Sequence, residues 1–352
     1  MNGAVGSPQV RTPEIDPAVS IAEMRVSPGI ARWLKGPKAD PSVRARFLLE
    51  VDGCSRNDSR VRSAVKAIGR TGWAARLLHQ QWPDGHWGPP GTSGPSLYRP
   101  KFVTTHWMAM VLADLGLTRT HPRVRKAAEL ILDRYSRDGT RHPLDYRPGR
   151  HGEICVSGMM ARALIRFGYL DHPAVQRTID WIVRTQKSDG GWNHESSHSG
   201  TFDAWEGLAA LAEIPTDERT EKVTRSIERG AEFFLRHRLM DEGRARYAPW
   251  FRIHYPNFYY YDVLVGLRVV TRLGYGTDPR TAPAFEWLRR KQLPGGQWPL
   301  DASVPDIDYV RGMYYYRDET VHPLLLEPLH GPSQWATVEA LSVMRLAKKL
   351  EA

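Results

Sequence analysis

The chain has 352 residues, 41% of them hydrophobic and 25% charged, which is the composition of a globular protein and excludes a disordered or collagen-like chain. No apolar run reaches the ~20 residues that a membrane-spanning helix needs, and two cysteines are too few for a disulfide framework, so we expect a cytoplasmic protein. The net charge of +10 is spread along the chain without clusters of basic and aromatic residues, so we expect no nucleic-acid partner.

A seven-residue motif recurs three times along the chain. It occupies residues 81–87, 186–192 and 292–298, and each copy has Gln first, a Gly-containing turn in the middle and Trp last. Degenerate copies lie halfway between, at Asp138-Gly139 and Glu242-Gly243, which gives a period of about 53 residues. A fixed period of this size is typical of a repeat architecture.

Two kinds of helical segment alternate within each period. Arg-rich amphipathic segments at 122–136, 173–187 and 280–292 begin with a proline or follow one, as helix starts do. Apolar segments rich in small residues are expected to form buried helices, most of them ending at glycine or proline. These segments are 102–115, 154–167, 202–214, 259–273 and 334–347. No segment shows the period-two alternation of a strand, so we expect none.

This alternation predicts two concentric layers of helices. Each apolar helix is covered on its outer side by an amphipathic one and faces a common axis on the other side. We therefore expect an all-α fold, an α/α toroid of five to six helix pairs over residues 29–352, preceded by an N-terminal arm at 1–28. An open superhelix of the same repeats is the alternative.

The motif and its period resemble the QW-type repeats of squalene and hopene cyclases, class II diterpene cyclases and protein prenyltransferase β-subunits. The resemblance covers about residues 30–347 and implies an (α/α) barrel. The motif itself is interpreted as structural: the Gln bridges helix ends, the turn follows, and the Trp packs beneath it. Trp82, Trp87, Trp192 and Trp298 are therefore expected to stabilise the fold rather than to contact a substrate.

The site is expected where the N-terminal ends of the inner helices converge, because these ends carry unexpected polar and aromatic residues. An acid among aromatic residues has a raised pKa and can donate a proton, so Asp203 or Asp262 is the expected donor. His106, Glu206 and Tyr261 are expected to orient that acid or to accept a proton at the end of the reaction. Substrate contacts are predicted for Trp107, Cys155, Phe202, Trp205, Tyr259, Tyr260 and Trp335. The aromatic faces of Trp107, Trp205, Tyr260 and Trp335 are expected to stabilise positive charge on the substrate.

Other interpretations of the same residues remain open. Asp203 and Asp262 also suit the capping of a helix start. Class II cyclases begin their reaction with an Asp-x-Asp-Asp motif, and the start of the 202–214 segment matches only its last acid, at Asp203. Prenyltransferases hold zinc with Asp, Cys and His; here Glu153 and Cys155 have that spacing, with His198 as a third ligand.

The functional prediction is an enzyme of the terpene-cyclase type, which uses an acid to start cyclisation or isomerisation of a largely apolar, isoprenoid-like substrate. It needs no cofactor and no metal, and its partner is a small apolar or amphiphilic substrate. Membrane contact is left open. The alternatives are a zinc-dependent, prenyltransferase-like transferase and a non-catalytic toroid that binds lipid or peptide.

Overall fold

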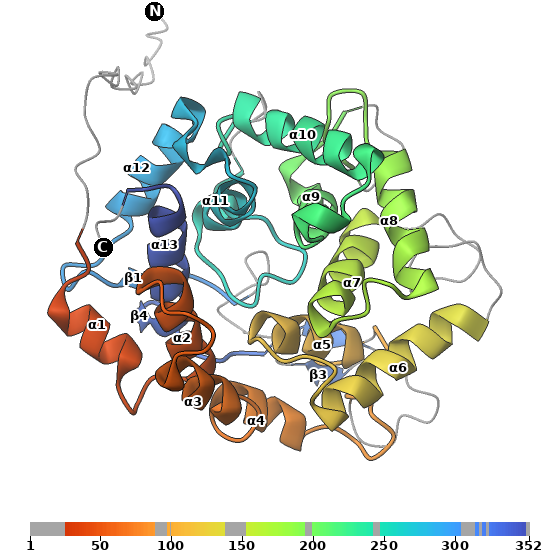
Figure 1. Ribbon diagram of the computed structural model, residues 1–352, viewed down its shortest axis with the longest axis horizontal. Helices are drawn as coiled ribbons and strands as arrows, with labels where there is room; N and C mark the ends of the chain where they lie inside the picture. Colours follow the sequence, from red (N-terminus) through yellow and green to blue (C-terminus); the bar gives the residue numbers. More distant parts are fainter. Residues whose placement is uncertain are drawn as a thin grey trace, which may run out of the picture.

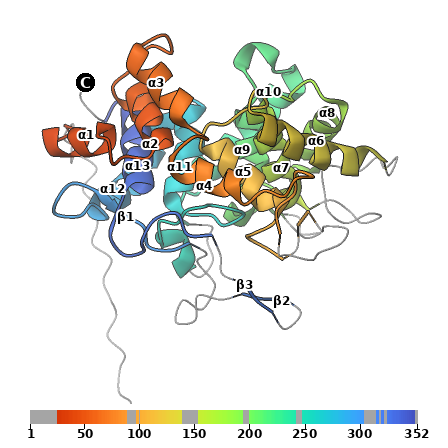
Figure 2. The same ribbon diagram turned by 90° about the horizontal axis from the view of Figure 1, so that it is seen from below.

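The computed structural model describes residues 25–88, 97–98, 100–137, 153–193, 199–241, 247–303, 314–316, 319–321 and 324–349. Within these residues, two concentric layers of helices surround one axis (Figure 1). The predicted all-α toroid is confirmed. Figure 2 shows the ring from its edge, with α3 rising on one side and the strands β2 and β3 on the other.

The inner layer consists of apolar helices whose residues are buried on nearly every side, as expected for helices covered all round. They are α2 (Pro41–Arg46) continued by the π-helical turn η1 (Phe47–Val51), α5 (Thr105–Asp114), α7 (Ile154–Phe167), α9 (Glu206–Ala212), α11 (Val263–Arg272) and α13 (Gln334–Leu346). Gly168, with φ 94°, ends α7 in the left-handed conformation that glycine adopts without strain.

The outer layer consists of amphipathic helices that bury one stripe against the inner layer. They are α1 (Pro28–Lys35), α3 (Ser59–Ala67), α4 (Gly72–His79), α6 (Pro122–Arg137), α8 (Pro173–Thr185), α10 (Glu221–Arg236) and α12 (Ala282–Arg290). In α8 the buried stripe runs through Val175, Ile179 and Ile182, at the spacing of one helix face. Short 3-10 turns lie between helices: η2 (Phe202–Ala204), η3 (Thr216–Glu218), η4 (Ala248–Phe251), η5 (Tyr275–Thr277) and η6 (Pro279–Thr281).

The ring is closed by contacts between the two ends of the repeat array. Helix α13 packs against α2 and η1, and the Asp40 backbone N–H donates to Gln334 Oε1 at 2.9 Å. Arg46 forms an ion pair with Glu339 across the same junction. These contacts contradict the open superhelix.

The tryptophan that ends each complete motif ties its preceding outer helix to the turn. The indole N–H groups of Trp87, Trp192 and Trp298 donate to the carbonyls of Leu77, Ile182 and Leu288 at 2.7–2.8 Å. The first glutamine of each motif donates back to the glycine carbonyl of its own turn. The structural interpretation of the motif is confirmed, whereas Trp82 lies partly exposed and stacks on His86.

The structure differs from the sequence prediction at two kinds of place. Helices α5, α9 and α11 begin three or four residues later than expected, because the aromatic residues before them form turns and loops instead. Two short antiparallel strand pairs are present where none was expected: β1 (Trp298–Pro299) with β4 (Pro332–Ser333), and β2 (Tyr314–Tyr316) with β3 (Glu319–Val321). Strands of two or three residues are too short to show alternation.

No helix in the ranges given above has both the length and the apolar character that crossing a membrane requires.

Candidate active site

Aromatic side chains pack together at the end of the ring axis where the inner helices begin. The connection between α10 and α11 crosses the middle of the ring in Figure 1. From it, Phe258 packs against Trp107 and Phe102 with ring centroids 5.1 and 5.3 Å apart, and Tyr255 stacks on Trp335 at 4.0 Å. Among the described residues, the connecting segment thus packs its aromatic side chains against those of α5 and α13 near the beginnings of these helices.

Two of the predicted site residues belong to a packed aromatic cluster. Phe202 stacks on Tyr261 at 4.9 Å and also contacts Phe234 and Trp250. The Tyr261 hydroxyl donates to the Leu239 carbonyl at 2.8 Å. This places Phe202 and Tyr261 in the core between α9, α10 and α11, where they hold helices together.

Three more predicted substrate contacts lie around the filled end. Trp107 is fully buried and its indole N–H donates to the Tyr98 carbonyl. Tyr259 and Tyr260 are half-buried, and their hydroxyl oxygens are 3.1 Å apart. Lys101 lies over the Tyr259 ring and donates to its hydroxyl at 3.2 Å. Trp107 on α5 and Tyr259 on the connecting segment also contact each other, with ring centroids 5.8 Å apart.

The two candidate proton donors have different surroundings. Asp203 accepts a hydrogen bond from the Trp250 indole at 2.8 Å. Asp262 caps helix α11, since its Oδ1 accepts from the Val265 N–H at 2.7 Å, so the capping interpretation is confirmed for it. Its second oxygen, Oδ2, lies 2.8 Å from Nδ1 of His254, and both side chains are buried.

The contacts of His254 hold its imidazole in place beside Asp262. Its Nε2 lies 3.1 Å from the Tyr260 carbonyl, and its Nδ1 lies near the Arg252 carbonyl as well as the carboxylate. Carbonyl oxygens only accept hydrogen bonds, so the contact with Tyr260 favours a hydrogen on Nε2. The distance of 2.8 Å between Nδ1 and Asp262 Oδ2 suits a hydrogen bond between the two side chains.

A small enclosed cavity adjoins this pair. Its volume is about 10 Å³, roughly what one water molecule needs. Asp262 and His254 line it together with Asn257, Arg268 and Glu339, and Trp335 forms part of its wall. Of the predicted site residues, Asp262 and Trp335 are thus brought together, and His254 joins them.

Glu206 and His106 lie buried near the starts of α9 and α5. Burial raises the pKa of Glu206 well above its ordinary value, and neither of its carboxyl oxygens has a hydrogen-bond partner among the described residues. Burial therefore favours the protonated form of the Glu206 carboxyl group. Burial lowers the pKa of His106 to about 4, so its imidazole is neutral at pH 7.

The zinc alternative rests on residues that the structure describes only in part. The Cys155 thiol lies 3.9 Å from Glu153 Oε2, whereas His198 lies outside the described residues. Among the described residues there is no group of three or more His, Cys, Asp or Glu side chains that could hold a metal ion.

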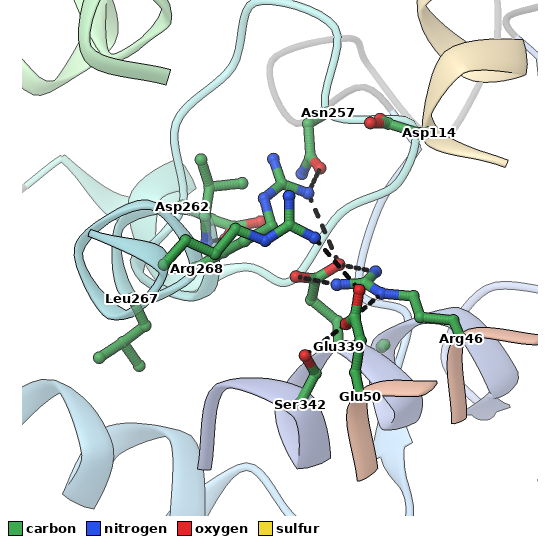
Figure 3. Close-up of polar contacts among 12 residues, drawn as sticks. Arg46, Glu50, Asp114, Asn257, Asp262, Leu267, Arg268, Glu339 and Ser342 are labelled. Carbon is green, nitrogen blue, oxygen red and sulfur yellow. Dashed lines mark hydrogen bonds and ion pairs between the residues drawn. The ribbon is translucent and has the colours of Figure 1, made fainter. Parts of the chain in front are cut away.

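A set of charged side chains lies around the half of the ring axis where the inner helices end. Each inner helix, or the residue that ends it, contributes one or two of them. We call this set the axial ion-pair ring; part of it is drawn in Figure 3. The ion pairs join each arginine to acids on neighbouring helices over distances up to 3.6 Å. Its members are Arg46, Glu50, Asp114, Arg162, Arg166, Glu213, Arg268, Arg272 and Glu339.

The arginines keep the acids of this ring ionised. Burial alone would raise the pKa of Glu213, but Arg166, Arg272 and Arg162 lower it to about 2. Burial likewise opposes ionisation of Asp114, and Arg162 and Arg166 still hold its pKa below the ordinary value. Each carboxylate is therefore charged at neutral pH, and the contacts of the ring join charged arginines to charged acids.

A cavity of about 880 Å³ opens on this end of the axis, and we call it the axial cavity. The ring residues Arg46, Arg166, Arg268 and Arg272 line it beside three ring acids. Two predicted aromatic contacts face the same ring: Trp335 lies 5.3 Å from the Arg46 guanidinium, and Trp205 lies 5.7 Å from that of Arg268. Both indoles thus already face a cation.

The sequence analysis missed His254 and the axial ion-pair ring. The ring had a signal: one or two charged residues inside an otherwise mostly apolar inner-helix segment, such as Arg162 and Arg166 in 154–167. His254 had none, because it lies in an irregular segment between repeats.

A known protein family matches the part of the chain that contains α5, α7 and α9. Residues 95–216 match the family model of the squalene-hopene cyclase C-terminal domain. Over this segment, the resemblance predicted from the repeats is confirmed. The matched segment includes α5, α7 and α9, and hence Asp114, Arg162, Arg166 and Glu213 of the ring.

Relatives align over shorter stretches. The squalene–hopene cyclase of Bradyrhizobium diazoefficiens is 28% identical over 131 residues, which are 34% of this chain and 19% of that protein. The chloroplastic monofunctional isopimaradiene synthase of Pinus contorta is 37% identical over 75 residues, which are 21% of this chain and 8% of that protein. The chain therefore spans less than a fifth of the length of either curated relative.

A solved structure covers more of the chain. A variant of the type II terpene cyclase MstE from Scytonema, in complex with the product merosterolic acid A, aligns over 88% of this chain and 87% of its own. The identity is 17% and the TM-score is 0.45.

Proposed function

We propose that this protein is a terpene-cyclase-like enzyme that starts cyclisation or isomerisation of a largely apolar, isoprenoid-type substrate by protonating it, with Asp262 as the donor. The buried pair of Asp262 and His254, in contact at 2.8 Å beside an enclosed cavity, is the observation that carries the proposal. The match of residues 95–216 to a squalene-hopene cyclase domain supports the choice of chemistry.

The proton transfer is simple to balance. The O–H bond of Asp262 breaks as a bond forms between that proton and an alkene carbon or an epoxide oxygen, and a carbocation results on the substrate. His254 orients the carboxyl group and balances the charge left on it. Loss of a proton from the final cation ends the reaction, so the product has the mass of the substrate.

Two tryptophans are placed to stabilise the cation. Trp335 lines the small cavity beside Asp262, and Trp205 faces Arg268, which lines the same cavity. A cation over an indole face in a dry site gains about 2 kcal/mol. That both rings already face a guanidinium supports this role for them.

Substrate access requires a movement. The cavity beside Asp262 has about the volume of one water molecule, and Ile253, His254 and Asn257 form part of its wall. The proposal therefore includes withdrawal of the segment that carries Tyr255 and Phe258 from the axis, which would open the space that these rings fill. Such segment motions commonly control entry to enzyme sites.

Matched substitutions of the two candidate donors test the proposal. Asp262→Asn keeps the helix cap, since Asn caps as well as Asp, but removes the acid. Incubation with squalene or geranylgeranyl dihydroxybenzoate, followed by mass spectrometry for products of unchanged mass, is expected to show turnover about 10²–10⁴-fold lower for this variant. Asp203→Asn is the control and is expected to keep wild-type turnover.

His254→Gln provides the second measurement, because it leaves Asp262 and its cap in place. It is expected to lower turnover and to shift the pH profile, since the imidazole beside the Asp262 carboxyl group is removed. Wild-type turnover in both Asp262→Asn and His254→Gln would overturn the acid role of this pair. If the wild-type protein binds these isoprenoids and converts none, the non-catalytic binding toroid replaces the enzyme.

A further inference from the structure

The axial ion-pair ring contains more cations than anions. Its five arginines are Arg46, Arg162, Arg166, Arg268 and Arg272, and its four acids are Glu50, Asp114, Glu213 and Glu339. All four carboxylates are ionised, since the pKa of each lies below its ordinary value. The ring, whose members Arg162, Arg268 and Glu339 are buried, therefore has one more positive charge than its described acids balance.

The contacts show which arginine holds that charge. Arg46, Arg162, Arg166 and Arg272 each pair with two acids of the ring. Arg268 reaches one, Glu339, at 3.6 Å, and its hydrogen bond at 3.2 Å is to the neutral amide oxygen of Asn257. Glu339 is already bound by both terminal nitrogens of Arg46.

One donor group of Arg268 is left over. Its Nη2 is buried and has no hydrogen-bond partner among the described residues, and the whole side chain is 4% exposed. A buried unpaired donor on a charged group costs more than almost any other polar defect. Burial accordingly lowers the pKa of Arg268.

Helix dipoles do not supply the missing negative charge here. The carbonyl ends of the inner helices favour cations in the last turn, where Arg166 and Arg272 lie. Arg268 lies one turn further into α11, and this effect falls off within the last turn.

The space beside Arg268 suits an amphiphilic ligand. Arg268 lines the axial cavity of about 880 Å³, and the exposed Arg56, Lys66 and Arg70 line it too. Apolar lining comes from residues such as Leu49, Ile68 and Ala113. A basic approach to a cavity attracts anions, and the apolar wall accepts a hydrocarbon chain.

We propose that the axial cavity binds the oxyanion group of an amphiphilic ligand, a carboxylate or a phosphate, with Arg268 as its main partner. The ligand completes the ring by balancing its extra charge and accepting from the free donor of Arg268. Arg268 and Trp335 line both this cavity and the one beside Asp262. The bound head group is therefore separated from the proposed proton donor by little more than one side chain. That the ligand is the substrate rests on the proposed function; the anion site itself does not.

Binding of a matched series of probes to the 352-residue chain tests this proposal. The probes are dodecanoate, dodecyl phosphate and dodecan-1-ol, each below its micelle concentration and measured by isothermal titration calorimetry. At least one of the two anions is expected to bind ten times more tightly than the alcohol, and the better anion identifies the head group. Equal binding of all three, or no binding of either anion, overturns the proposal. Saturable binding of chloride alone, with no effect of dodecanoate, also overturns it.

Two substitutions in the same ring separate anion binding from stability. Arg268→Met removes the extra charge, so the ligand-free variant is expected to melt at or above the wild-type temperature and to bind dodecanoate no more tightly than dodecanol. Arg46→Met leaves two acids with poorer partners and is expected to melt lower. An undiminished anion preference in Arg268→Met overturns the proposal.

The wild-type series decides the question even if Arg268→Met fails to fold, and Arg268→Gln is the second variant. Asp262→Asn is expected to bind the anions like wild type. Loss of turnover in Asp262→Asn and loss of anion preference in Arg268→Met are therefore independent results, and either proposal can fail without the other.

Discussion

The two ends of the ring axis are built in opposite ways. At one end Phe258 and Tyr255 fill the space with aromatic rings, and at the other the arginines and acids of the axial ion-pair ring border an open cavity. The same inner helices serve both ends: α7 and α11 are apolar where they begin and carry arginines in their later turns. The inner helices therefore have aromatic packing around their first turns and charged side chains, which border a cavity, around their later turns.

The largest effect on the free energy of unfolding is expected from removing the charge of one acid at the charged end of the axis. Asp114 accepts hydrogen bonds from Arg162 and Arg166, both at 2.6 Å, and its side chain is 6% exposed. Asp114→Asn is expected to lower the free energy of unfolding by about 3–5 kcal/mol, because two buried arginines lose a shared partner. Denaturant unfolding followed by circular dichroism measures the loss.

The matched control is an ion pair on the outer layer. Glu286 pairs with the exposed Arg289 and Arg290 on α12, and Glu286→Gln is expected to cost less than about 1 kcal/mol. If the two substitutions cost the same, the axial ion-pair ring has no special part in stability.

At the end of the axis packed with aromatic rings, we expect an effect on how the free energy of unfolding depends on pH. The pKa of His106 falls from 6.5 when unfolded to about 4 in the fold because of burial, which corresponds to about 3 kcal/mol. The folded state binds the proton less readily, so this contribution is intact above pH 6.5 and is lost as the pH falls toward 4. In His106→Leu, the free energy of unfolding is expected to change less between pH 6.5 and 4.5 than it does in wild type.

The same titration distinguishes the two ends. The acids of the ring have lowered pKa values, that of Glu213 being about 2, so their contribution is present above pH 4.5 and disappears only below it. His106→Leu is therefore expected to retain the steep loss of stability below pH 4.5. A variant that still loses stability between pH 6.5 and 4.5 as wild type does would show that His106 is not the group responsible.

Glu206 is expected to behave in the opposite direction. Burial raises its pKa, so it stabilises the fold least at high pH, where the unfolded chain releases the proton that the folded chain keeps. Glu206→Gln is expected to be more stable than wild type at pH 8, with the gap shrinking toward pH 5. A gap that does not change with pH would show that Glu206 is ionised in the fold.

The sequence was sufficient for the parts of this fold that are set locally. The Trp and Gly of each motif act within one turn and its own outer helix. The Gln of the first two copies also donates to a carbonyl of the next outer helix, so the period and the toroid follow from these contacts. The filling of the axis did not follow, because Tyr255 and Phe258 enter from an irregular segment whose path depends on Trp335 and Trp107, distant in the chain.

The candidate site was anticipated only where residue type and position agreed. Asp262 was expected as an acid at a helix start, and it is one; His254, eight residues earlier, follows no repeat and reaches it through the bend of the connecting segment. The charged residues of the inner helices were visible in the sequence, but only the closed ring shows that they meet.

The junction of α2 with α13 has a consequence for synthesis of the protein. Arg46 meets Glu339 across 293 residues of chain, so the first inner helix leaves the ribosome long before its neighbour exists. Until then its arginine lacks Glu339, and the apolar side of α2 that α13 covers has nothing to cover it. Nascent chains stalled before residue 334 are therefore expected to engage chaperones, whereas the 352-residue chain encloses these groups once α13 docks.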